Sequence, residues 1–273
     1  MQITREEFNR LSGFIERYFG IHLSDKKREL IVGRLHQVLS RKGFSTFSEY
    51  YEYIIRDRSG AAVAELVDKI STNHTFFMRE ADHFRFFGQT VLPELAASVS
   101  SKDLRIWSAG CSSGEEPYTL AMIISDFFGE SKPMWDTKIL ATDLSGAVLR
   151  KAESGIYSNE QLEVLPGHWK KRYLRKLDAE TSIVADKIRQ EVIFRRFNLM
   201  ETVFPFKKPL HVIFCRNVMI YFEHAVKMAL LRKFYDHLAP GGYLFIGHSE
   251  SFPRDQLKLN YVMPAVYRKG ERM

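Results

Sequence analysis

Apolar side chains recur every three or four residues over about the first seventy positions of the chain. This spacing is typical of one face of an α-helix, which turns once in about 3.6 residues. It predicts two helices before residue 43 and two more over about 47–56 and 61–70. Because no strand pattern occurs among them, we predict a helical domain over residues 1–72. The apolar positions of the first two helices are Phe8, Leu11, Phe14, Ile15, Tyr18, Leu30, Ile31, Leu35, Val38 and Leu39.

Local residues mark the ends of the second helix. Ser24 and Asp25 have side chains that favour a helix N-cap. Gly43 follows the last apolar position, where glycine is a common C-cap. We therefore expect this helix to begin just after Asp25 and to end at Gly43.

The pattern changes after about residue 104, where short apolar runs alternate with helical segments. Strands are predicted at 104–109, 138–142, 211–215, 243–247 and 260–268. Helices are predicted at 117–128, 144–152 and 225–238. Strands that alternate with helices favour right-handed crossovers and a parallel, doubly wound sheet. We therefore predict an α/β fold for residues 73–273.

One segment interrupts this alternation. Residues 156–197 contain a helical piece near 169–174 and two β-rich runs at 182–185 and 192–194. Short runs of this kind, bounded by turn residues, are typical of strands. We interpret about 156–197 as a small β-subdomain inserted into the sheet domain.

The composition limits the class of protein. The chain has 273 residues, of which 45% are apolar and 27% charged, which is enough for one large core and a smaller one. Its net charge of +7 is typical of proteins with an anionic partner, such as nucleic acid or an acidic protein face. Charge alone does not choose between these partners, and a basic surface that only faces solvent is the alternative.

Cysteine content and the length of apolar runs bear on location. Cys111 and Cys215 lie in separate apolar segments, without the spacing of a disulfide framework or a metal site. No apolar run is long enough to cross a bilayer, and the first residues lack the pattern of a signal peptide. We therefore expect a cytoplasmic protein without direct membrane insertion and without a bound metal.

The end of the first predicted strand is typical of a ligand-binding turn. Gly110 and Gly114 let the backbone turn sharply, and Pro117 suits the first turn of the next helix. The spacing Gly-x-x-x-Gly differs from the Gly-x-Gly-x-x-Gly of dinucleotide sites, which argues against a nicotinamide dehydrogenase. Glu115 and Glu116 would repel a pyrophosphate but suit a cation such as a sulfonium. A purely structural turn is the alternative.

The second predicted strand is followed by Asp143. In a doubly wound sheet, ligands bind at the carboxyl ends of the strands, and an acidic residue there commonly binds the ribose hydroxyls. Together with the glycine-containing turn, Asp143 favours an adenosine-bearing ligand. A helix N-cap is the other interpretation of this residue.

Several longer motifs match a known family. They are STNHTFFMRE at 71–80, AGCSSGEEPY at 109–118, ATD at 141–143, NL at 198–199, FCRNVMIYF at 214–222 and GHSE at 247–250. In this order and over nearly the whole chain, they resemble the chemotaxis receptor methyltransferases, the CheR family.

The resemblance implies a class I methyltransferase fold, with S-adenosylmethionine as cofactor and S-adenosylhomocysteine as product. It also implies methyl transfer to glutamate side chains of chemotaxis receptors. By motif position, Arg79 and Tyr221 border the methyl-transfer site. The implied cofactor contacts are Asn73, Thr75, Arg79, Glu115, Asp143, Asn198, Leu199, Arg216 and Asn217.

Esterification of glutamate needs positioning rather than a general base. A glutamate side chain has a pKa near 4.3, so at pH 7 its carboxylate is already the nucleophile. The Arg79 guanidinium can hold a carboxylate by two parallel hydrogen bonds, but a carboxylate held so tightly would lose nucleophilicity. We therefore expect Arg79 to orient one oxygen, with Tyr221 on the other side of the pocket. From the sequence alone, Arg79 could instead pair with Glu80 or Asp82, and Tyr221 could be a core aromatic.

Two features bear on the partner. Lys27, Arg34 and Arg41 are spaced by seven residues and are predicted to share a helix face, which could dock the glutamate-rich helices of a receptor. A solvated face is the alternative. Some relatives tether themselves to a receptor C-terminal peptide through a glycine-containing loop of the β-subdomain. The segment 177–182 has no glycine, so we predict that the tether peptide is not needed.

Two other functions fit parts of the sequence. A nucleic-acid methyltransferase would suit the basic charge, but no motif for base stacking or a basic groove occurs near Asn198 or Asn217. A non-catalytic adaptor would not require the complete set of motifs. We therefore expect an enzyme that has no nucleic-acid partner.

Overall fold

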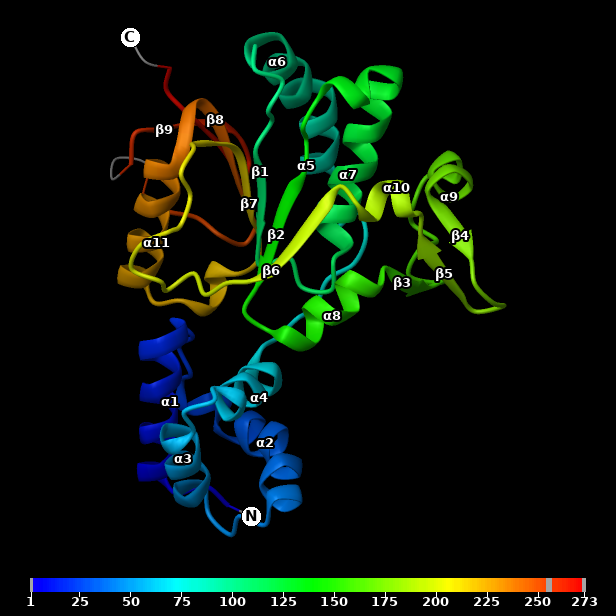
Figure 1. The fold of residues 1–273 in the computed structure, drawn as a ribbon. Coiled ribbons are helices and arrows are strands. Elements are labelled where there is room, and N and C mark those ends of the chain that lie inside the picture. Colours follow the sequence, from blue (N-terminus) through cyan, green and yellow to red (C-terminus); the bar gives the residue numbers. More distant parts are fainter. Residues whose placement is uncertain (1, 254–256, 272–273) are drawn as a thin grey trace.

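The computed structural model describes residues 2–253 and 257–271 and has three parts (Figure 1). A helical domain at the N-terminus lies against one end of a seven-stranded sheet. A three-stranded sheet, here called the insert, projects from the side of the larger one. No helix within the described ranges is long and apolar enough to cross a bilayer.

The helical domain consists of α1 (Arg5–Phe19), α2 (Arg28–Lys42), α3 (Phe47–Arg56) and α4 (Ala61–Ile70). The expected helices at 47–56 and 61–70 are confirmed. Thr4 and Thr46 begin α1 and α3 with capping boxes, in which each threonine exchanges hydrogen bonds with the glutamate three residues later. Gly43, with a φ of 77°, ends α2 as expected.

The expected N-cap of α2 is wrong. Residues Asp25–Lys27 form a 3₁₀ turn, α2 begins at Arg28, and the Ser24 side chain makes no capping hydrogen bond. The apolar faces of the four helices meet in a core of their own, separate from the cores of the sheet domain. Its fully buried members include Leu11, Ile15, Ile31, Leu35, Leu39, Tyr50 and Leu66.

The larger sheet contains β1 (Ile106–Ala109), β2 (Ile139–Asp143), β6 (Val192–Arg196), β7 (Leu210–Cys215), β8 (Leu238–Ile246), β9 (Leu259–Met263) and β10 (Val266–Lys269). Their order is β6-β2-β1-β7-β8-β10-β9. The first five run parallel, and β10 is antiparallel to both of its neighbours. The strand order reverses between β1 and β7, which is where doubly wound sheets bind ligands. The predicted α/β fold is therefore confirmed.

Two strand assignments are corrected by the structure. The expected single strand at 260–268 is a hairpin of β9 and β10, because the chain turns at residues 264–265 and Ala265 has a φ of 62°. The run 192–194, expected in the insert, belongs to β6. This strand pairs in parallel with β2, from Ile139 opposite Val192 to Asp143 opposite Arg196.

Successive residues along the strands point to opposite faces and build two cores. Ile106 of β1 packs into one core and Trp107 into the other. The first face is covered by α7 (Glu115–Phe128), α8 (Gly146–Ser154) and a helical run not expected from the sequence. The other face is covered by α11 (His224–His237) and the loop after β6. The unexpected run consists of α5 (Ala81–Phe86), a π-helical turn (Phe87–Val91) and α6 (Leu92–Ser98).

The insert is an antiparallel sheet of β3 (Ile156–Ser158), β5 (Thr181–Val184) and β4 (Leu174–Lys176), with α9 (Gly167–Tyr173) beside it. Asp126, near the end of α7, anchors α9. Its carboxylate accepts hydrogen bonds from the side chains of His168, Trp169, Arg172 and Tyr173. The short helix α10 (Asp186–Arg189) leads from the insert back to β6.

Candidate active site

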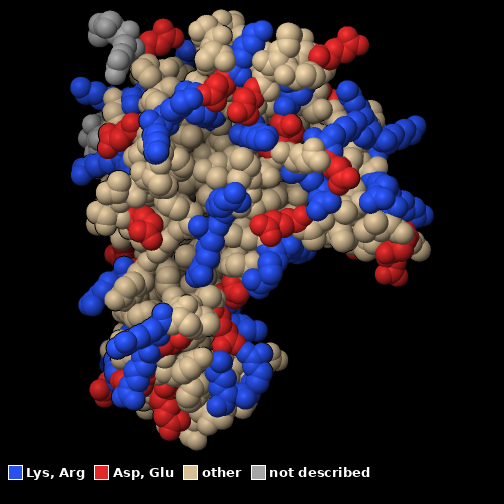
Figure 2. All heavy atoms as spheres, in the orientation of Figure 1, with Lys and Arg blue, Asp and Glu red and all other residues tan. Residues whose placement is uncertain are grey.

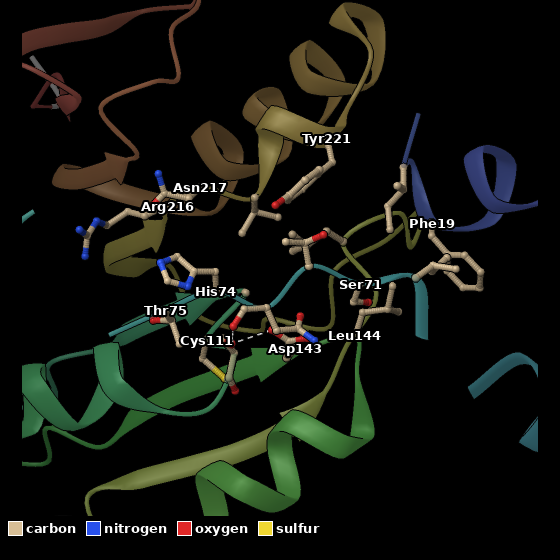
Figure 3. A pocket seen from close by; sticks show the side chains of 18 of the residues that line it. Phe19, Ser71, His74, Thr75, Cys111, Asp143, Leu144, Arg216, Asn217 and Tyr221 are labelled. Atoms are coloured by element: carbon tan, nitrogen blue, oxygen red, sulfur yellow. Dashed lines mark hydrogen bonds between the residues drawn. The ribbon is translucent and has the colours of Figure 1, made fainter. Parts of the chain in front are cut away.

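A cavity of about 250 Å³ lies where the helical domain meets the carboxyl ends of β1, β2 and β7 (Figure 3). Residues 71–80, here called the linker, join the two domains and form part of its wall. All the predicted site residues except Glu115 line this cavity, namely Asn73, Thr75, Arg79, Asp143, Asn198, Leu199, Arg216, Asn217 and Tyr221.

The turn after β1 forms one side of the cavity. Gly110 has a φ of 88°, and a Cβ atom there would overlap the side chain of Val218, so this close approach requires glycine. Ser112 also has a positive φ, of 49°. Its hydroxyl donates a hydrogen bond of 2.9 Å to the Asn73 carbonyl. The turn thereby holds the linker against the strand ends.

Asp143 ends β2 and lines the cavity. The backbone N–H groups of Ser112 and Ser145 each donate to its carboxylate at 2.9 Å. Burial raises the pKa of Asp143, and these hydrogen bonds oppose the rise. Ser145 is the N-cap of α8, because its hydroxyl accepts from the Val148 N–H. Asp143 therefore has no capping role at this helix.

Two adjacent glutamates at the start of α7 have different surroundings. Glu115 is buried outside the cavity lining, accepts hydrogen bonds from the Ser113 hydroxyl at 2.8 and 2.9 Å, and has a pKa raised by burial. Glu116 lines the cavity and accepts from the Ser108 hydroxyl at 2.7 Å. Of the two, Glu116 lines the cavity and Glu115 does not, so contact between Glu115 and the cofactor stays a prediction that the cavity lining does not favour.

Arg216, just after β7, is the centre of a buried charge cluster. Its Nη1 lies 3.0 Å from Glu116 Oε2 and its Nη2 lies 3.1 Å from Glu80 Oε2, while its side chain is only 3% exposed. Burial alone would raise the pKa of Glu80, but the charge of Arg216 and a hydrogen bond from Asn217 outweigh this and lower it. Two carboxylates thus fix this guanidinium at the cavity wall.

Asn217 has a left-handed backbone, with a φ of 57°. Its N–H donates to Glu250 at 2.9 Å, and its side-chain amide donates to Glu80 at 3.2 Å. A Cβ atom at Gly247 would lie 2.8 Å from the Asn217 backbone nitrogen, so only glycine permits this approach. The motif residues Gly247 and Glu250 therefore act by supporting Asn217.

Arg79 lies on the linker and donates a hydrogen bond of 2.8 Å to the His74 carbonyl. The carboxylates nearest in sequence have other partners, because Glu80 pairs with Arg216 and Asp82 with His248. Within the described residues, Arg79 forms no ion pair. The surface ion pair considered from the sequence is therefore not formed.

Tyr221 ends a 3₁₀ turn (Met219–Tyr221) and lines the cavity. Its side chain is only half-buried, so the core position considered from the sequence is wrong. The Nζ of Lys27 lies 5.5 Å from the centre of the tyrosine ring. The Tyr221 carbonyl accepts a 2.8 Å hydrogen bond from the His22 N–H. The segment before α2 thus holds Tyr221 in place.

The helical domain supplies a wall that the motifs do not reveal. Asn198 donates from its amide to the Tyr18 carbonyl at 2.7 Å, and Ile21 forms an antiparallel bridge with Phe222. These contacts close the cavity on one side. The residues of this wall belong to no sequence motif. Only the packing of the helical domain against the sheet domain shows that they line the cavity. They include Phe19, Ile21, Leu23, Leu30, Ile31 and Ile70.

Comparison with known proteins decides the family. Residues 6–71 match the all-alpha domain of CheR methyltransferases, and residues 73–267 match their SAM-binding domain. The chain belongs to the CheR methyltransferase family. It is 43% identical to the chemotaxis protein methyltransferase of Borreliella burgdorferi, over 99% of this chain and 96% of that one. It is 36% identical to the chemotaxis protein methyltransferase of Escherichia coli, over 92% of this chain and 86% of that one.

As a CheR methyltransferase, the protein uses S-adenosylmethionine and releases S-adenosylhomocysteine. The cavity residues fit this cofactor. The Asp143 carboxylate at the end of β2 suits ribose hydroxyls, and Glu116, which is paired with Arg216, adds a second carboxylate to the lining. The wall formed by the helical domain is mainly apolar, which suits the uncharged parts of an adenosine ligand.

The three basic residues expected to dock a receptor do not form one free face. Lys27 and Arg34 line the cavity. Arg34 donates hydrogen bonds to residues 70–72, and Arg41 pairs with Glu65. Of the three, Lys27 is the one whose charge lies beside Tyr221.

Proposed function

We propose that this protein methylates glutamate side chains of chemotaxis receptors and forms glutamate methyl esters for sensory adaptation. The observation that carries the proposal is Arg79, a guanidinium on the cavity wall without a carboxylate partner in the described part of the chain. A guanidinium suits an acidic acceptor and repels a cationic one. The relatives named chemotaxis protein methyltransferases support receptors as the substrate.

The reaction needs positioning and no general base. When bound, S-adenosylmethionine supplies a methyl group on sulfonium sulfur and leaves as a neutral thioether. A glutamate side chain has a pKa near 4.3, so at pH 7 its carboxylate is already the nucleophile. Arg79 holds one carboxylate oxygen by a charge-assisted hydrogen bond, which leaves the other oxygen free to attack.

Removal of water from the reacting carboxylate is the second contribution of the protein. Leu30 and Phe76 line the cavity and are 46% and 48% exposed. A receptor helix that covers these side chains and Tyr221 excludes water from the reacting groups. It also brings the glutamate within attacking distance of the methyl group.

The cofactor contacts in this proposal are the predicted residues that line the cavity. Asp143 binds the ribose hydroxyls. Glu116 takes the place proposed for Glu115, which instead supports the turn through Ser113. The other contacts are Asn73, Thr75, Arg79, Asn198, Leu199, Arg216 and Asn217.

The receptor docks beside Lys27, at the side of the cavity that carries Tyr221. Arg41 is 67% exposed and, although paired with Glu65, can add to the attraction of an acidic helix. On the face seen in Figure 2, Lys and Arg are interspersed with Asp and Glu rather than gathered in one continuous groove. This distribution favours local contacts with a protein over a track along a nucleic-acid backbone.

We also propose that catalysis does not require a receptor C-terminal tether peptide. The turn between β4 and β5 is closed by Asp178, whose carboxylate accepts hydrogen bonds from the N–H groups of Glu180 and Thr181 at 2.8 and 2.7 Å. A side chain closes this turn where tethered relatives use a glycine. Calorimetry with a receptor C-terminal peptide should show no binding, and tight binding would overturn the proposal.

The substrate is tested by transfer of labelled methyl groups from S-adenosylmethionine to receptor fragments. Mild base should then release labelled methanol, because esters hydrolyse and methylated amines do not. Label that resists base, or label found only on RNA offered in parallel, would contradict glutamate esterification.

The role of Arg79 is tested separately. Arg79→Ala should lower turnover by about 100-fold, which corresponds to roughly 2.7 kcal/mol of lost transition-state stabilisation. Affinity for S-adenosylhomocysteine should fall by no more than about tenfold, which is 1.4 kcal/mol. The turnover of Arg79→Lys should lie between those of the wild type and Arg79→Ala, because lysine keeps the charge and loses the planar set of donors. Normal turnover by Arg79→Ala would remove this residue from the mechanism.

A further inference from the structure

The sequence places Arg34 on a docking face, but its guanidinium is turned toward its own chain. Nη1 donates to the Ile70 carbonyl at 2.6 Å and to the Ser71 carbonyl at 3.4 Å. Nη2 donates to the Thr72 hydroxyl at 3.1 Å. The side chain is half-buried, and it pairs with no carboxylate in the part of the chain that the structure describes. To reach a receptor glutamate, Arg34 would have to give up these acceptors.

The acceptors lie where the chain leaves α4 and enters the linker. Ile70 is the last residue of α4, and its carbonyl is one of those without a partner inside the helix. A cationic side chain at a helix C-terminus both satisfies such a carbonyl and interacts favourably with the helix dipole. Residues 71–76 have no regular secondary structure, so side-chain contacts determine their path.

The same segment carries cofactor-site residues. Asn73 and Thr75 follow directly after the three acceptors and line the cavity. On the other side of the linker, the Ser112 hydroxyl donates to the Asn73 carbonyl at 2.9 Å. The Ser112 N–H donates to Asp143 at 2.9 Å. The linker is therefore held between Arg34 of the helical domain and Ser112 of the sheet domain.

We infer that Arg34 is a positioning residue for the cofactor site. It fixes the start of the linker, so that Asn73 and Thr75 stay in the cavity wall next to Asp143. The inference depends on the cofactor, which family membership establishes, and not on the receptor substrate. It assigns this basic residue of α2 to cofactor binding, whereas Lys27 lies beside Tyr221 at the cavity.

Calorimetry with S-adenosylhomocysteine, without any receptor, tests the inference. For Arg34→Met, we expect the dissociation constant to rise about tenfold. Arg34→Lys should give a smaller rise, because lysine can satisfy one carbonyl but lacks the planar fork. In turnover assays of Arg34→Met, KM for S-adenosylmethionine should rise by a similar factor. At saturating cofactor, kcat should stay within about twofold of the wild-type value, because bound cofactor restores the linker.

Arg28→Met is the matched control. Arg28 begins the same helix and also donates to a backbone carbonyl, that of Ile3, but it does not line the cavity. The dissociation constant of Arg28→Met for S-adenosylhomocysteine should stay within about twofold of the wild-type value. Thermal unfolding of Arg28→Met and Arg34→Met measures any loss of stability. Thr72→Val removes one acceptor of Arg34 without touching the arginine, and it should weaken binding by about threefold.

Three results would overturn the inference. The first is an unchanged affinity of Arg34→Met for S-adenosylhomocysteine. The second is an equal loss of affinity in Arg28→Met, which would reduce the effect to general destabilisation. The third is a rise in KM for the receptor with no change in KM for S-adenosylmethionine, which would show that Arg34 docks the receptor instead.

Discussion

The helical domain and the insert are attached to the same sheet domain in different ways. The helical domain meets it at the cavity, through the bridge between Ile21 and Phe222 and the hydrogen bond from Asn198 to Tyr18. The insert is held by Asp126 on α7, and none of residues 156–184 lines the cavity. The insert reaches the turn after β1 only through Tyr157, whose hydroxyl donates to the Ser113 carbonyl at 2.6 Å in the described structure. We therefore predict that the first domain contributes directly to the cofactor site, whereas the Asp126 anchor of the second acts mainly on stability.

The largest effect is expected at the anchor of the insert. Asp126→Ala leaves the side-chain donors of α9 without their acceptor, two of them partly buried, and should lower the free energy of unfolding by about 2–3 kcal/mol. Affinity for S-adenosylhomocysteine should stay within about twofold, or about 0.4 kcal/mol. Chemical denaturation and calorimetry measure the two quantities. The control is Asp186→Ala, since Asp186 is 75% exposed and its carboxylate forms a surface pair with Arg189.

A smaller change in stability, but a clear change in affinity, is expected at the contact of the helical domain. Asn198→Ala removes a hydrogen bond to the Tyr18 carbonyl and one from the Met200 N–H. The free energy of unfolding should therefore fall by about 1–2 kcal/mol. Because Asn198 lines the cavity, affinity for S-adenosylhomocysteine should also fall about tenfold.

Asn159→Ala is the matched control for Asn198→Ala. Asn159 makes a similar pair of contacts inside the insert, donating to the Ala179 carbonyl and accepting from the Ser182 hydroxyl. Its loss should reduce stability and leave affinity for S-adenosylhomocysteine unchanged. If both variants lost affinity equally, the contrast between the two domains would be wrong.

Acid should weaken the anchor of the insert. Burial alone would raise the pKa of Asp126, but hydrogen bonds from Tyr173, Trp169 and His168 and the charge of Arg172 outweigh this and lower it. A group with a lowered pKa in the folded state stabilises that state above its unfolded pKa, near 3.9 for aspartate, and loses this contribution as the pH falls further. The difference in unfolding free energy between wild type and Asp126→Asn should therefore be constant near neutral pH and shrink below about pH 4.

The smallest effect is expected where α4 meets α8. Asp68 accepts hydrogen bonds from the Ser145 hydroxyl at 2.6 Å and the Ala147 N–H at 3.3 Å. Asp68→Ala should lower the free energy of unfolding by about 1 kcal/mol. Because Ser145 also donates to Asp143, affinity for S-adenosylhomocysteine should fall by about twofold, measurable by calorimetry. A larger loss of affinity than in Asn198→Ala would reverse the proposed ranking of these contacts.

The parts of the fold that could be predicted are those with local signals. The helices at 47–56 and 61–70 show their apolar spacing within ten residues, and Gly43 marks an end by its own conformation. The assignment of β6 failed because its partner, β2, lies about fifty residues earlier, and parallel pairing leaves no local turn to mark it. The run 81–98 was not assigned, although its core residues Phe84, Phe87, Val91, Leu92 and Leu95 recur at the three- and four-residue spacing of one helix face.

The sequence motifs could indicate which residues lie near the site, but not in which direction their side chains point. Glu115 and Glu116 are both at the start of α7, and side chains of adjacent helical residues point about 100° apart, so only one of them faces the cavity. The position of the Arg34 guanidinium could not be predicted either, because its acceptors, two backbone carbonyls and the Thr72 hydroxyl, are brought to it by the packing of α2 against α4. The regular spacing of basic residues along a helix therefore did not show which of them is available to a partner and which already binds groups of its own chain.

The linker also limits how this enzyme can be recombined. A crossover within residues 71–79 would separate Asn73, Thr75 and Arg79 from the arginine or the serine that holds them, so a hybrid would lose a wall of its cofactor site at the junction. An exchange of the insert would have to keep an acidic residue at the position of Asp126 and the acceptor of Tyr157, which donates to the Ser113 carbonyl at 2.6 Å. A functional hybrid should therefore take the helical domain, the linker and the sheet domain from one parent.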